Sequence, residues 1–457
     1  MLIRRLLIRK RSGITNILKI TAALIFIGLV IRPPFSSGIL ADPSIEAEYS
    51  IEAEYAADEA FTAEDPFAAE DTYVTEDEDA AGPDSPTDIH EDAWPLTDFA
   101  DLDAKIDKAF KTYKTIGGAV VVMKGETLVY ERYYGQARKT GRMPVTAQTY
   151  FRITSISKFI TGIGVMRLTE EGRLSLDADI GNILELPIRN RKYAKTPVTL
   201  RMVMTHTSGL LDAPSFTNTA NSLKDIFEKN KTRSVFSEKA PGKIFSYSNY
   251  GGGMMGSVIE KATGKSQNTY MSEILFGPLR LDAAYHPAML LYPDEIVHQY
   301  NREGTVDRTA QSALNAAYED TCDPISHFRY AIGNLWFTAA DLAKVGAMMN
   351  GGGQFGGARV LSAETCALMM EDQVGRNGIQ AKTPYALMCE RFTTLAEGKV
   401  IYGHQGQALG MVSELFFDPE TGFTMALLTN GCSRAIDRRI CLIGRSMFKL
   451  LYPVFAP

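Results

Sequence analysis

The sequence lacks the usual signatures of metal centres and of several hydrolase classes. None of its 5 cysteines forms a Cys-x-x-Cys pair, and no spacing of cysteine and histidine resembles a zinc site. No His-Glu-x-x-His motif occurs, which argues against a zinc peptidase. No Gly-x-Ser-x-Gly motif occurs either, which argues against an α/β-hydrolase. We therefore expect no metal and no cofactor.

Cysteine is scarce, and its odd number leaves at least one thiol unpaired or in an intermolecular bond. Because cysteine is commonly buried, most of these residues are expected to be buried free thiols. Cys432 and Cys441 lie close together in the sequence and could pair in an oxidising compartment.

Acidic residues are absent from the first 41 positions, which carry 7 basic residues. An apolar run from Ile20 to Ile31 is shorter than the roughly 20 residues that span a bilayer comfortably. This layout is typical of export, so we interpret residues 1–41 as a signal peptide or, if Lys19 snorkels, a signal anchor. The charge bias places the chain after Arg32 outside the cytoplasm, either secreted or held at the membrane by the uncleaved segment. The alternative is a cytosolic amphipathic helix.

Basic residues are absent from the next segment. Between Asp42 and Asp92 there are 19 acidic residues and no Lys or Arg. The segment repeats Ser-Ile-Glu-Ala-Glu-Tyr at residues 44–49 and 50–55. High charge and low apolar content cannot offset the cost of ordering the backbone, so we predict a disordered acidic tether over residues 42–93. Alternatively, the segment docks onto the more basic remainder of the chain.

A strongly basic surface is also missing. After the acidic segment the excess of positive charge is small, and no basic stripe with interleaved aromatic residues stands out. These features argue against a nucleic acid partner. A modest positive surface would suit anionic wall polymers.

The order of helical and strand patterns predicts the fold class. Residues 98–115 have apolar positions at helical spacing, and residues 117–134 read as a β-hairpin. A mostly helical middle is followed by a second hairpin at 413–429 and a closing helix at 435–451. We predict an α+β fold in which one antiparallel sheet is formed from both chain ends and a helical block is inserted. Residues 94–457 would form one catalytic domain.

Ser155 and Lys158 form a Ser-x-x-Lys motif. A serine hydroxyl is a poor nucleophile until a nearby base removes its proton. Three residues apart on a helix, the two side chains lie on one face and within reach of each other. The motif is weak by itself, because Ser446 and Lys449 also match it.

Tyr247 and Asn249 lie in a glycine-rich stretch and form a second motif, Tyr-Ser-Asn. A phenol beside an ammonium loses its proton more easily, because the positive charge favours the phenolate. Tyr247 could then relay protons between Ser155 and a leaving group. The alternative is a buried core tyrosine in a turn.

His404, Gly406 and Gln407 form a third motif just before the second hairpin. Their position predicts an edge strand of the sheet. Gly406 has no side chain, so a substrate backbone could approach the strand closely. The backbone N–H groups of Gln407 and Ser155 could form an oxyanion hole. The alternative for His404 is an ordinary surface or core histidine.

The order of the three motifs resembles that of the serine β-lactamase-like, or penicillin-binding, superfamily, which includes class C β-lactamases, D-alanyl-D-alanine carboxypeptidases and esterases. Residues 204–210 resemble its Thr-His-Thr-Ser-Gly-Leu stretch, and residues 333–342 resemble its Gly-Gly…Ser/Thr-x-x-Asp-Leu segment. The resemblance covers residues 94 to about 450. It implies the fold named above and a serine hydrolase activity.

The resemblance also implies an acyl-enzyme mechanism. Ser155 would attack a carbonyl, Lys158 and Tyr247 would share the role of base, and Tyr247 would protonate the leaving group. Asn249, His404, Gly406 and Gln407 would bind the substrate, and water would hydrolyse the ester. His206 is expected to brace its loop instead of serving as a triad histidine.

Two residues depart from the family pattern. His404 stands where many β-lactamases have Lys, and Gln405 stands where Thr or Ser usually offers a hydroxyl to a substrate carboxylate. Gln405 could still donate from its amide. The leading hypothesis is hydrolysis of D-amino-acid peptides such as cell-wall stem peptides. The alternatives are an esterase or amidase on small acyl compounds, a β-lactamase, and a non-catalytic wall-binding homologue.

Overall fold

The computed structural model describes residues 99–212, 221–228, 235–301, 303–379, 384–408, 410–433, 435–437 and 439–457. The predicted signal segment at 1–41 and the predicted acidic tether at 42–93 lie outside these residues. Among the described residues, no helix combines the length and apolar character needed to cross a bilayer.

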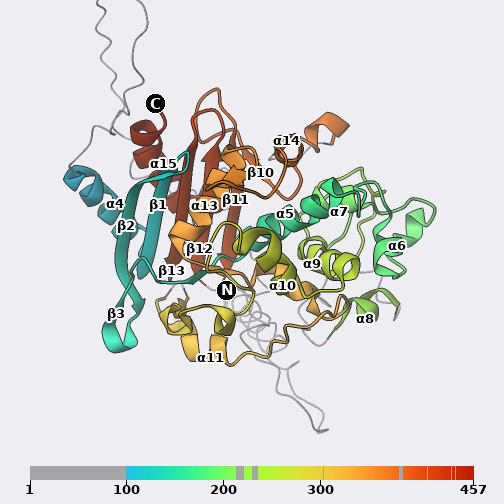
Figure 1. Cartoon of the computed structure of the whole chain (residues 1–457), viewed down its shortest axis with the longest axis horizontal. Coiled ribbons are helices and arrows are strands. Elements are labelled where there is room, and N and C mark those ends of the chain that lie inside the picture. The colour runs from blue at the N-terminus through green and yellow to red at the C-terminus, as the bar shows by residue number, and fades with distance from the viewer. Residues whose placement is uncertain are drawn as a thin grey trace, which may run out of the picture. The chain divides into compact units, whose positions relative to one another are not determined.

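One antiparallel sheet of seven strands is built from the two ends of the described chain. In spatial order the strands are β10 (Glu390–Phe392), β11 (Ile401–Ala408), β12 (Met411–Asp418), β13 (Phe423–Asn430), β1 (Gly117–Lys124), β2 (Thr127–Arg138) and β3 (Met143–Pro144). Figure 1 shows the teal strands β1 and β2 beside the red strands β11 to β13. The predicted hairpins and the predicted α+β fold class are confirmed.

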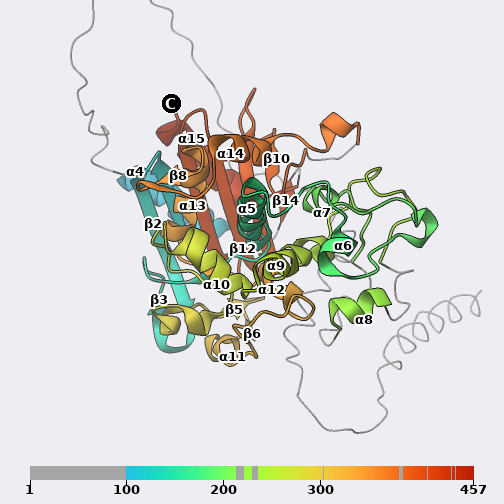
Figure 2. The ribbon, with the colours of Figure 1, turned by 45° about the vertical axis from the view of Figure 1, so that its right-hand side comes forward.

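Both faces of the sheet are covered. Alternate residues of β1 enter separate cores, Val120 and Val122 on one face and Val121 on the other. The first face packs against α4 (Ala100–Thr112) and α15 (Leu442–Phe455). The second packs against α13 (Ala339–Asn350) and α5 (Ile156–Glu170), which Figure 2 shows in front of the strands. Burial on both faces explains why β1 is almost entirely apolar.

The helical block lies on the α5 side of the sheet. Its main helix, α9 (Asn249–Thr263), packs against α5 and against α12 (Tyr330–Gly333). The shorter helices are α6 (Ile180–Leu184), α7 (Leu200–Met204), α8 (Leu223–Glu228), α10 (Gln267–Met271), α11 (Ala310–Leu314) and α14 (Ala363–Met370). The small strand pairs are β4 (Phe151–Arg152) with β7 (Trp336–Phe337), β5 (Gln299–Tyr300) with β6 (Val306–Arg308), β8 (Gln354–Phe355) with β9 (Ala358–Arg359), and β14 (Ile436–Asp437) with β15 (Ile440–Cys441).

The predicted closing helix at 435–451 is wrong at its start. Residues 436–441 form the hairpin of β14 and β15, and α15 begins only at Leu442. Arg439 has φ 67°, in the left-handed region, so a right-handed helix cannot run through it. The helix then continues to Phe455 in spite of Pro453.

All five cysteines are free thiols, four of them buried. The predicted buried free thiols are therefore confirmed for most of them, and the possible pair of Cys432 and Cys441 is not formed. The two side chains face different neighbours. Thr115 donates a hydrogen bond to Cys432, while Gln407 donates one to Cys441.

Candidate active site

Ser155 stands at the start of α5, immediately after a fixed turn. The pairing of β4 with β7 and the hydrogen bond from Ile153 N to Leu335 O (2.8 Å) hold the chain just before it. Thr154 has φ 48°, which is unusual for a β-branched residue and persists only where the surroundings enforce it. Ser155 is half-buried, and the rest of α5 is almost wholly buried, so the serine is presented from a rigid base.

Lys158 lies one turn along α5 and is fully buried. Its Nζ donates hydrogen bonds to Ser155 Oγ at 2.9 Å and to Ile332 O at 3.0 Å. The predicted contact between the serine and the lysine is therefore present. An amine in direct contact with a hydroxyl is the arrangement that general-base activation of a serine requires.

Tyr247 lies beside Lys158, on the loop that leads into α9. The Lys158 Nζ is 5.1 Å from the centre of the Tyr247 ring. The ring of His206 packs against the same tyrosine, with 4.3 Å between the ring centres. The first two sequence motifs thus meet in one place, although they are about ninety residues apart in the chain.

His206 holds the loop that carries Tyr247. Its backbone O accepts a hydrogen bond from Ser246 N at 2.8 Å, and its Nδ1 accepts one from Ser248 N at 3.2 Å. Burial, followed by the charge of Lys158, lowers the pKa of His206 well below 6.5, so the ring is neutral. A neutral ring whose Nδ1 accepts a backbone N–H has a structural role, as expected, but the loop that it braces is the one that carries Tyr247.

Asp212 is a part of the site that sequence reasoning missed. Its carboxylate accepts hydrogen bonds from Asn249 N at 2.8 Å, Tyr250 N at 3.1 Å and Ser248 Oγ at 3.3 Å. These N–H groups are at the positive end of α9, where a carboxylate is favoured. Asp212 therefore fixes the helix start directly after Tyr247. Asn249, the predicted substrate-binding residue, is the first residue of that helix.

His404 reaches the same cluster from β11. Its ring centre is 6.4 Å from that of Tyr247. The Nδ1 of His404 bonds to Gln405 O at 2.6 Å and the Nε2 to the Tyr385 hydroxyl at 3.2 Å. Because a carbonyl only accepts, Nδ1 carries the proton and the Tyr385 hydroxyl donates to Nε2. Burial, followed by the charge of Lys158, lowers the pKa of His404 to about 3.

Tyr385 was also missed by sequence reasoning. It is buried, and its ring packs against His206 at 5.0 Å between centres. Burial raises its pKa well above 10, so the hydroxyl stays protonated and able to donate. Nothing in the local sequence marks Tyr385, because its neighbours come from distant segments.

Gly406 lies against the turn before the nucleophile. A Cβ at this position would come within 1.9 Å of Thr154 Oγ1 and 2.6 Å of Ile153 O. The glycine therefore lets β11 approach the backbone that carries Ser155. The predicted role in substrate approach stays a prediction, and this packing is a separate reason for glycine.

Strand β11 is the second strand of the sheet, because β10 pairs with residues 401–403, so the predicted edge position holds only for the part of β11 beyond Gly403, where Gln407 lies. Gln405 N, two residues earlier, donates to Glu390 Oε1 on the β10 side at 3.1 Å. Backbone N–H groups point to the same edge at every second residue, so the N–H of Gln407 points to that edge too. Gly406 lies against Thr154, so Ser155 and Gln407 belong to neighbouring segments, and the oxyanion hole expected from their N–H groups stays a prediction.

Gln405 points to the other face of the sheet. Its amide Nε2 donates to Arg439 O at 2.9 Å and to Glu390 Oε2 at 3.3 Å, and its Oε1 accepts from Cys441 N at 3.2 Å. All of these partners belong to the protein. The side chain that stands in the position of the usual hydroxyl is thus committed to holding the β14–β15 hairpin.

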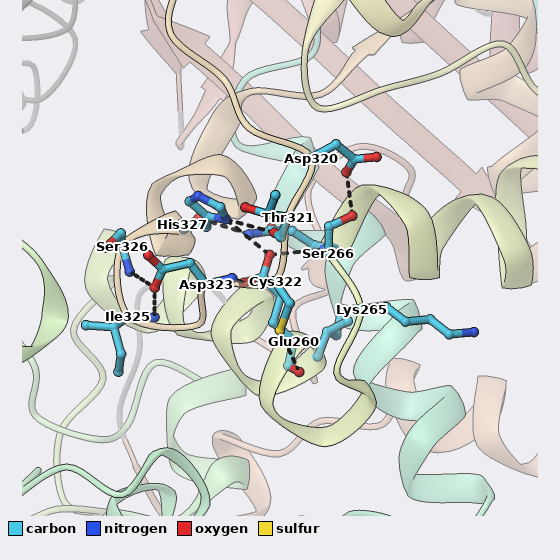
Figure 3. A network of polar contacts seen from close by, with 12 residues as sticks. Glu260, Lys265, Ser266, Asp320, Thr321, Cys322, Asp323, Ile325, Ser326 and His327 are labelled. Carbon is cyan, nitrogen blue, oxygen red and sulfur yellow. Dashed lines mark hydrogen bonds and ion pairs between the residues drawn. The ribbon is translucent and has the colours of Figure 1, made fainter.

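A polar network around Glu260 holds residues 320–327 (Figure 3), which precede the helix α12 that carries Ile332, the residue whose carbonyl accepts from Lys158. Glu260, buried near the end of α9, accepts from Gln267 N at 3.1 Å and from Asp323 N at 2.9 Å. His327 Nδ1 donates to Thr321 O at 3.1 Å and lies 3.7 Å from Glu260 Oε1. The neighbouring carboxyl group of Glu260 raises the pKa of His327 above 6.5.

A half-buried serine bonded to a buried lysine and facing a tyrosine, beside strand β11 of an antiparallel sheet, defines an acyl-transfer site of the serine hydrolase type. The family model for Beta-lactamase matches residues 102–440, which is most of the chain. The chain therefore belongs to the beta-lactamase family and is a serine hydrolase.

Relatives from other organisms agree with this assignment. Penicillin-binding protein 4 of Amycolatopsis lactamdurans is 27% identical over 340 residues, covering 71% of this chain and 83% of the relative. Esterase EstB of Burkholderia gladioli is 29% identical over 209 residues, covering 42% of this chain and 52% of the esterase. The octameric penicillin-binding protein homologue from Pyrococcus abyssi has a similar fold, with a TM-score of 0.61, 21% identity, and coverage of 78% and 77%.

Proposed function

We propose that this protein is an exported serine hydrolase that works through an acyl-enzyme on Ser155 and acts on D-amino-acid peptides such as cell-wall stem peptides. The observation that carries the chemistry is the 2.9 Å contact between Lys158 Nζ and Ser155 Oγ beside Tyr247. The alignment with a penicillin-binding protein over 83% of that relative supports the peptide substrate.

In the acylation step Ser155 Oγ attacks the substrate carbonyl, and Lys158 and Tyr247 take up its proton. The negative charge that develops on the carbonyl oxygen is stabilised by the N–H groups of Ser155 and Gln407. The carbon–nitrogen bond then breaks, Tyr247 returns the proton to the leaving amine, and Ser155 is left as an ester.

In the deacylation step water attacks this ester. Lys158 and Tyr247 accept the proton of the water, and Ser155 Oγ leaves with a proton as the carboxylic acid is released. His404 is neutral and its two ring nitrogens are bonded to Gln405 and Tyr385, so it shapes the wall of the site without adding a second cation beside Lys158.

The proposed location is extracytoplasmic. The support is the basic and then apolar composition of residues 1–41. If this segment is not cleaved, it would hold the protein at the membrane. A wall polymer or peptide is then the natural partner, and the small charge excess of the domain gives no reason to expect nucleic acid.

An esterase or amidase acting on small acyl compounds is the second candidate. Its support is Gln405, whose amide is bonded to Glu390, Arg439 and Cys441 and so is not placed to bind a free substrate carboxylate. The match to the esterase covers 42% of this chain, whereas the match to the penicillin-binding protein covers 71%. The esterase is therefore the weaker support of the two.

One set of assays separates these functions. We expect release of D-Ala from a stem peptide by the wild-type protein and a loss of at least about 10³-fold in Ser155→Ala. Faster turnover of p-nitrophenyl esters, with no D-Ala release, would favour the esterase. Turnover of nitrocefin would favour a β-lactamase. Absence of any fluorophosphonate adduct on Ser155 would favour a non-catalytic binding protein.

A further inference from the structure

Cys441 contacts the third motif, residues 404–407, on the face of the sheet opposite the His404 side chain. It is fully buried, and it is the last residue of β15 and the position directly before α15. Its backbone N donates to Gln405 Oε1 at 3.2 Å, and its Sγ accepts a hydrogen bond from Gln407 Nε2. One residue thus holds the side chains of both glutamines in the stretch 405–407 of the edge strand.

The same thiol reaches the neighbouring strand. Gln405 is paired with Glu414 of β12, so both side chains lie on the face opposite His404. Glu414 is fully buried beside Cys441, and among the described residues neither of its carboxyl oxygens has a hydrogen-bond partner. Burial raises the pKa of Glu414 well above 4.5, so this carboxyl is neutral.

Helix α15 presses directly on this cluster. A Cβ added at Gly444 would come within 2.8 Å of Glu414 Oε1, so the helix backbone lies on the carboxyl. Cys441 is therefore enclosed between Gln407, Glu414 and the helix. Close packing leaves Cys441 little room to move, so it also fixes the positions of the two glutamines to which it is hydrogen-bonded.

Strand β11 has few backbone partners on its outer side in the part that is proposed to face the substrate. Among the described residues, β10 pairs with β11 only from Ile401 to Gly403. Beyond Gly403 the outer edge of β11 is held by the contact of Gln405 with Glu390, and its inner edge by β12. An oxyanion donor must stand about 2.7–3.1 Å from the developing charge, so a small displacement of this stretch weakens it.

We propose that Cys441 is a positioning residue for the oxyanion hole, acting through the side chain of Gln407 to fix the N–H of that residue. The inference rests on the proposed function, because it assigns a partner to the same acyl site. Cys441 does not touch the substrate. It holds the donor in place from the opposite face of the sheet.

The test uses four variants of the full-length protein: Cys441→Ala, Cys441→Ser, Gln407→Met and Cys432→Ala. Cys441→Ala removes the acceptor of Gln407, Cys441→Ser keeps a small group that accepts and donates, and Gln407→Met removes the donor at similar volume. Cys432→Ala is the matched control, because Cys432 is equally buried but contacts Thr115. The measurements are kcat and KM on an activated ester, thermal unfolding, and affinity for a boronic acid whose adduct with Ser155 mimics the tetrahedral oxyanion.

We expect Cys441→Ala and Gln407→Met to lower kcat about 10-fold with little change in KM, since loss of an oxyanion donor outright costs more, about 10²–10³-fold. Affinity for the boronic acid should fall by a similar factor, and Cys441→Ser should recover most of both. Cys432→Ala should lose stability with no change in kcat or boronic acid affinity.

Two other outcomes are informative. If Cys441→Ala and Gln407→Met bind the boronic acid as tightly as the wild type, the positioning role is overturned while the proposed function stands. If the wild-type protein forms no boronate adduct that depends on Ser155, the proposed function fails and the inference fails with it.

Discussion

Gly252 of α9 lies directly against the aliphatic chain of Lys158. A Cβ at Gly252 would stand 2.5 Å from Lys158 Cδ and 2.6 Å from Cε, closer than real Cβ contacts come. We predict that Gly252→Ala displaces Lys158 from Ser155 and lowers kcat by about 10²-fold, since misplacing a reacting group by 1 Å can cost that much. Steady-state kinetics on an ester substrate would measure the loss.

Gly251 provides the matched control for this prediction. A Cβ at Gly251 would meet Val203 at 3.4 Å and Ser248 Cβ at 3.8 Å, both ordinary contacts, so Gly251→Ala should leave kcat within a few-fold of the wild type. Equal losses of kcat in the two variants would contradict the prediction, because they would show that both substitutions disturb helix α9 and that the space beside Lys158 is not the cause.

Asp212 should matter for both stability and rate, because it accepts the first N–H groups of α9 directly after Tyr247. We predict that Asp212→Ala lowers the free energy of unfolding by about 1–2 kcal/mol, as loss of a helix cap does. It should also reduce kcat, because Tyr247 loses the anchor of its loop. Chemical denaturation and kinetics would measure the two effects.

Thr309 offers the comparison for Asp212. It caps α11 by accepting a hydrogen bond from Ser312 N at 3.0 Å, and no site residue follows it. Thr309→Ala should lower stability without lowering kcat. A normal kcat in Asp212→Ala would mean that Tyr247 is positioned by its other contacts.

His404 should make the folded protein sensitive to acid. Its pKa is lowered to about 3, while an unfolded chain titrates near 6.5. As the pH falls from 6.5 towards 3, the unfolded state takes up a proton that the folded state refuses, so stability falls. We predict that His404→Asn reduces the slope of unfolding free energy against pH between pH 6 and 4 by about 1.4 kcal/mol per pH unit. Parallel slopes in wild type and variant would contradict this.

His327 should act in the opposite direction. The Glu260 carboxyl group, 3.7 Å away, raises its pKa above 6.5, so the stabilisation contributed by protonated His327 is fully present below pH 6.5. That stability is lost as the pH rises through the raised pKa. We predict a decline in the free energy of unfolding of the wild type on the alkaline side, and a flatter profile in His327→Gln. Denaturation series from pH 6 to 9 would measure it.

Sequence patterns predicted what is local and periodic. The two hairpins, the sheet made of both chain ends, and the contact of Ser155 with Lys158 follow from strand alternation and helix spacing, and the structure has them. The β14–β15 hairpin was missed because Ile436 and Ile440 stand four residues apart, which is also the spacing of a helix face, and the left-handed φ of Arg439 is not visible in the sequence.

Contacts between segments that are distant in the chain could not be predicted from the sequence. Tyr385 and Asp212 belong to the site because distant segments meet there. The sequence around a single tyrosine or aspartate does not indicate which residues it will contact in the fold. The same holds for Gln405: the sequence shows an amide in place of a hydroxyl, while its direction depends on how Cys441 and Arg439 pack.

Because β1 pairs with β13, the site can be completed only late in the synthesis of the chain. The sheet cannot close until residue 430 has been made, long after Ser155 and Lys158 have left the ribosome. Pairing between such distant segments is slow compared with local hairpins. The nascent chain therefore carries its nucleophile without the edge strand that faces it, and a product truncated before β11 would keep Ser155, Lys158 and Tyr247 but have no working site.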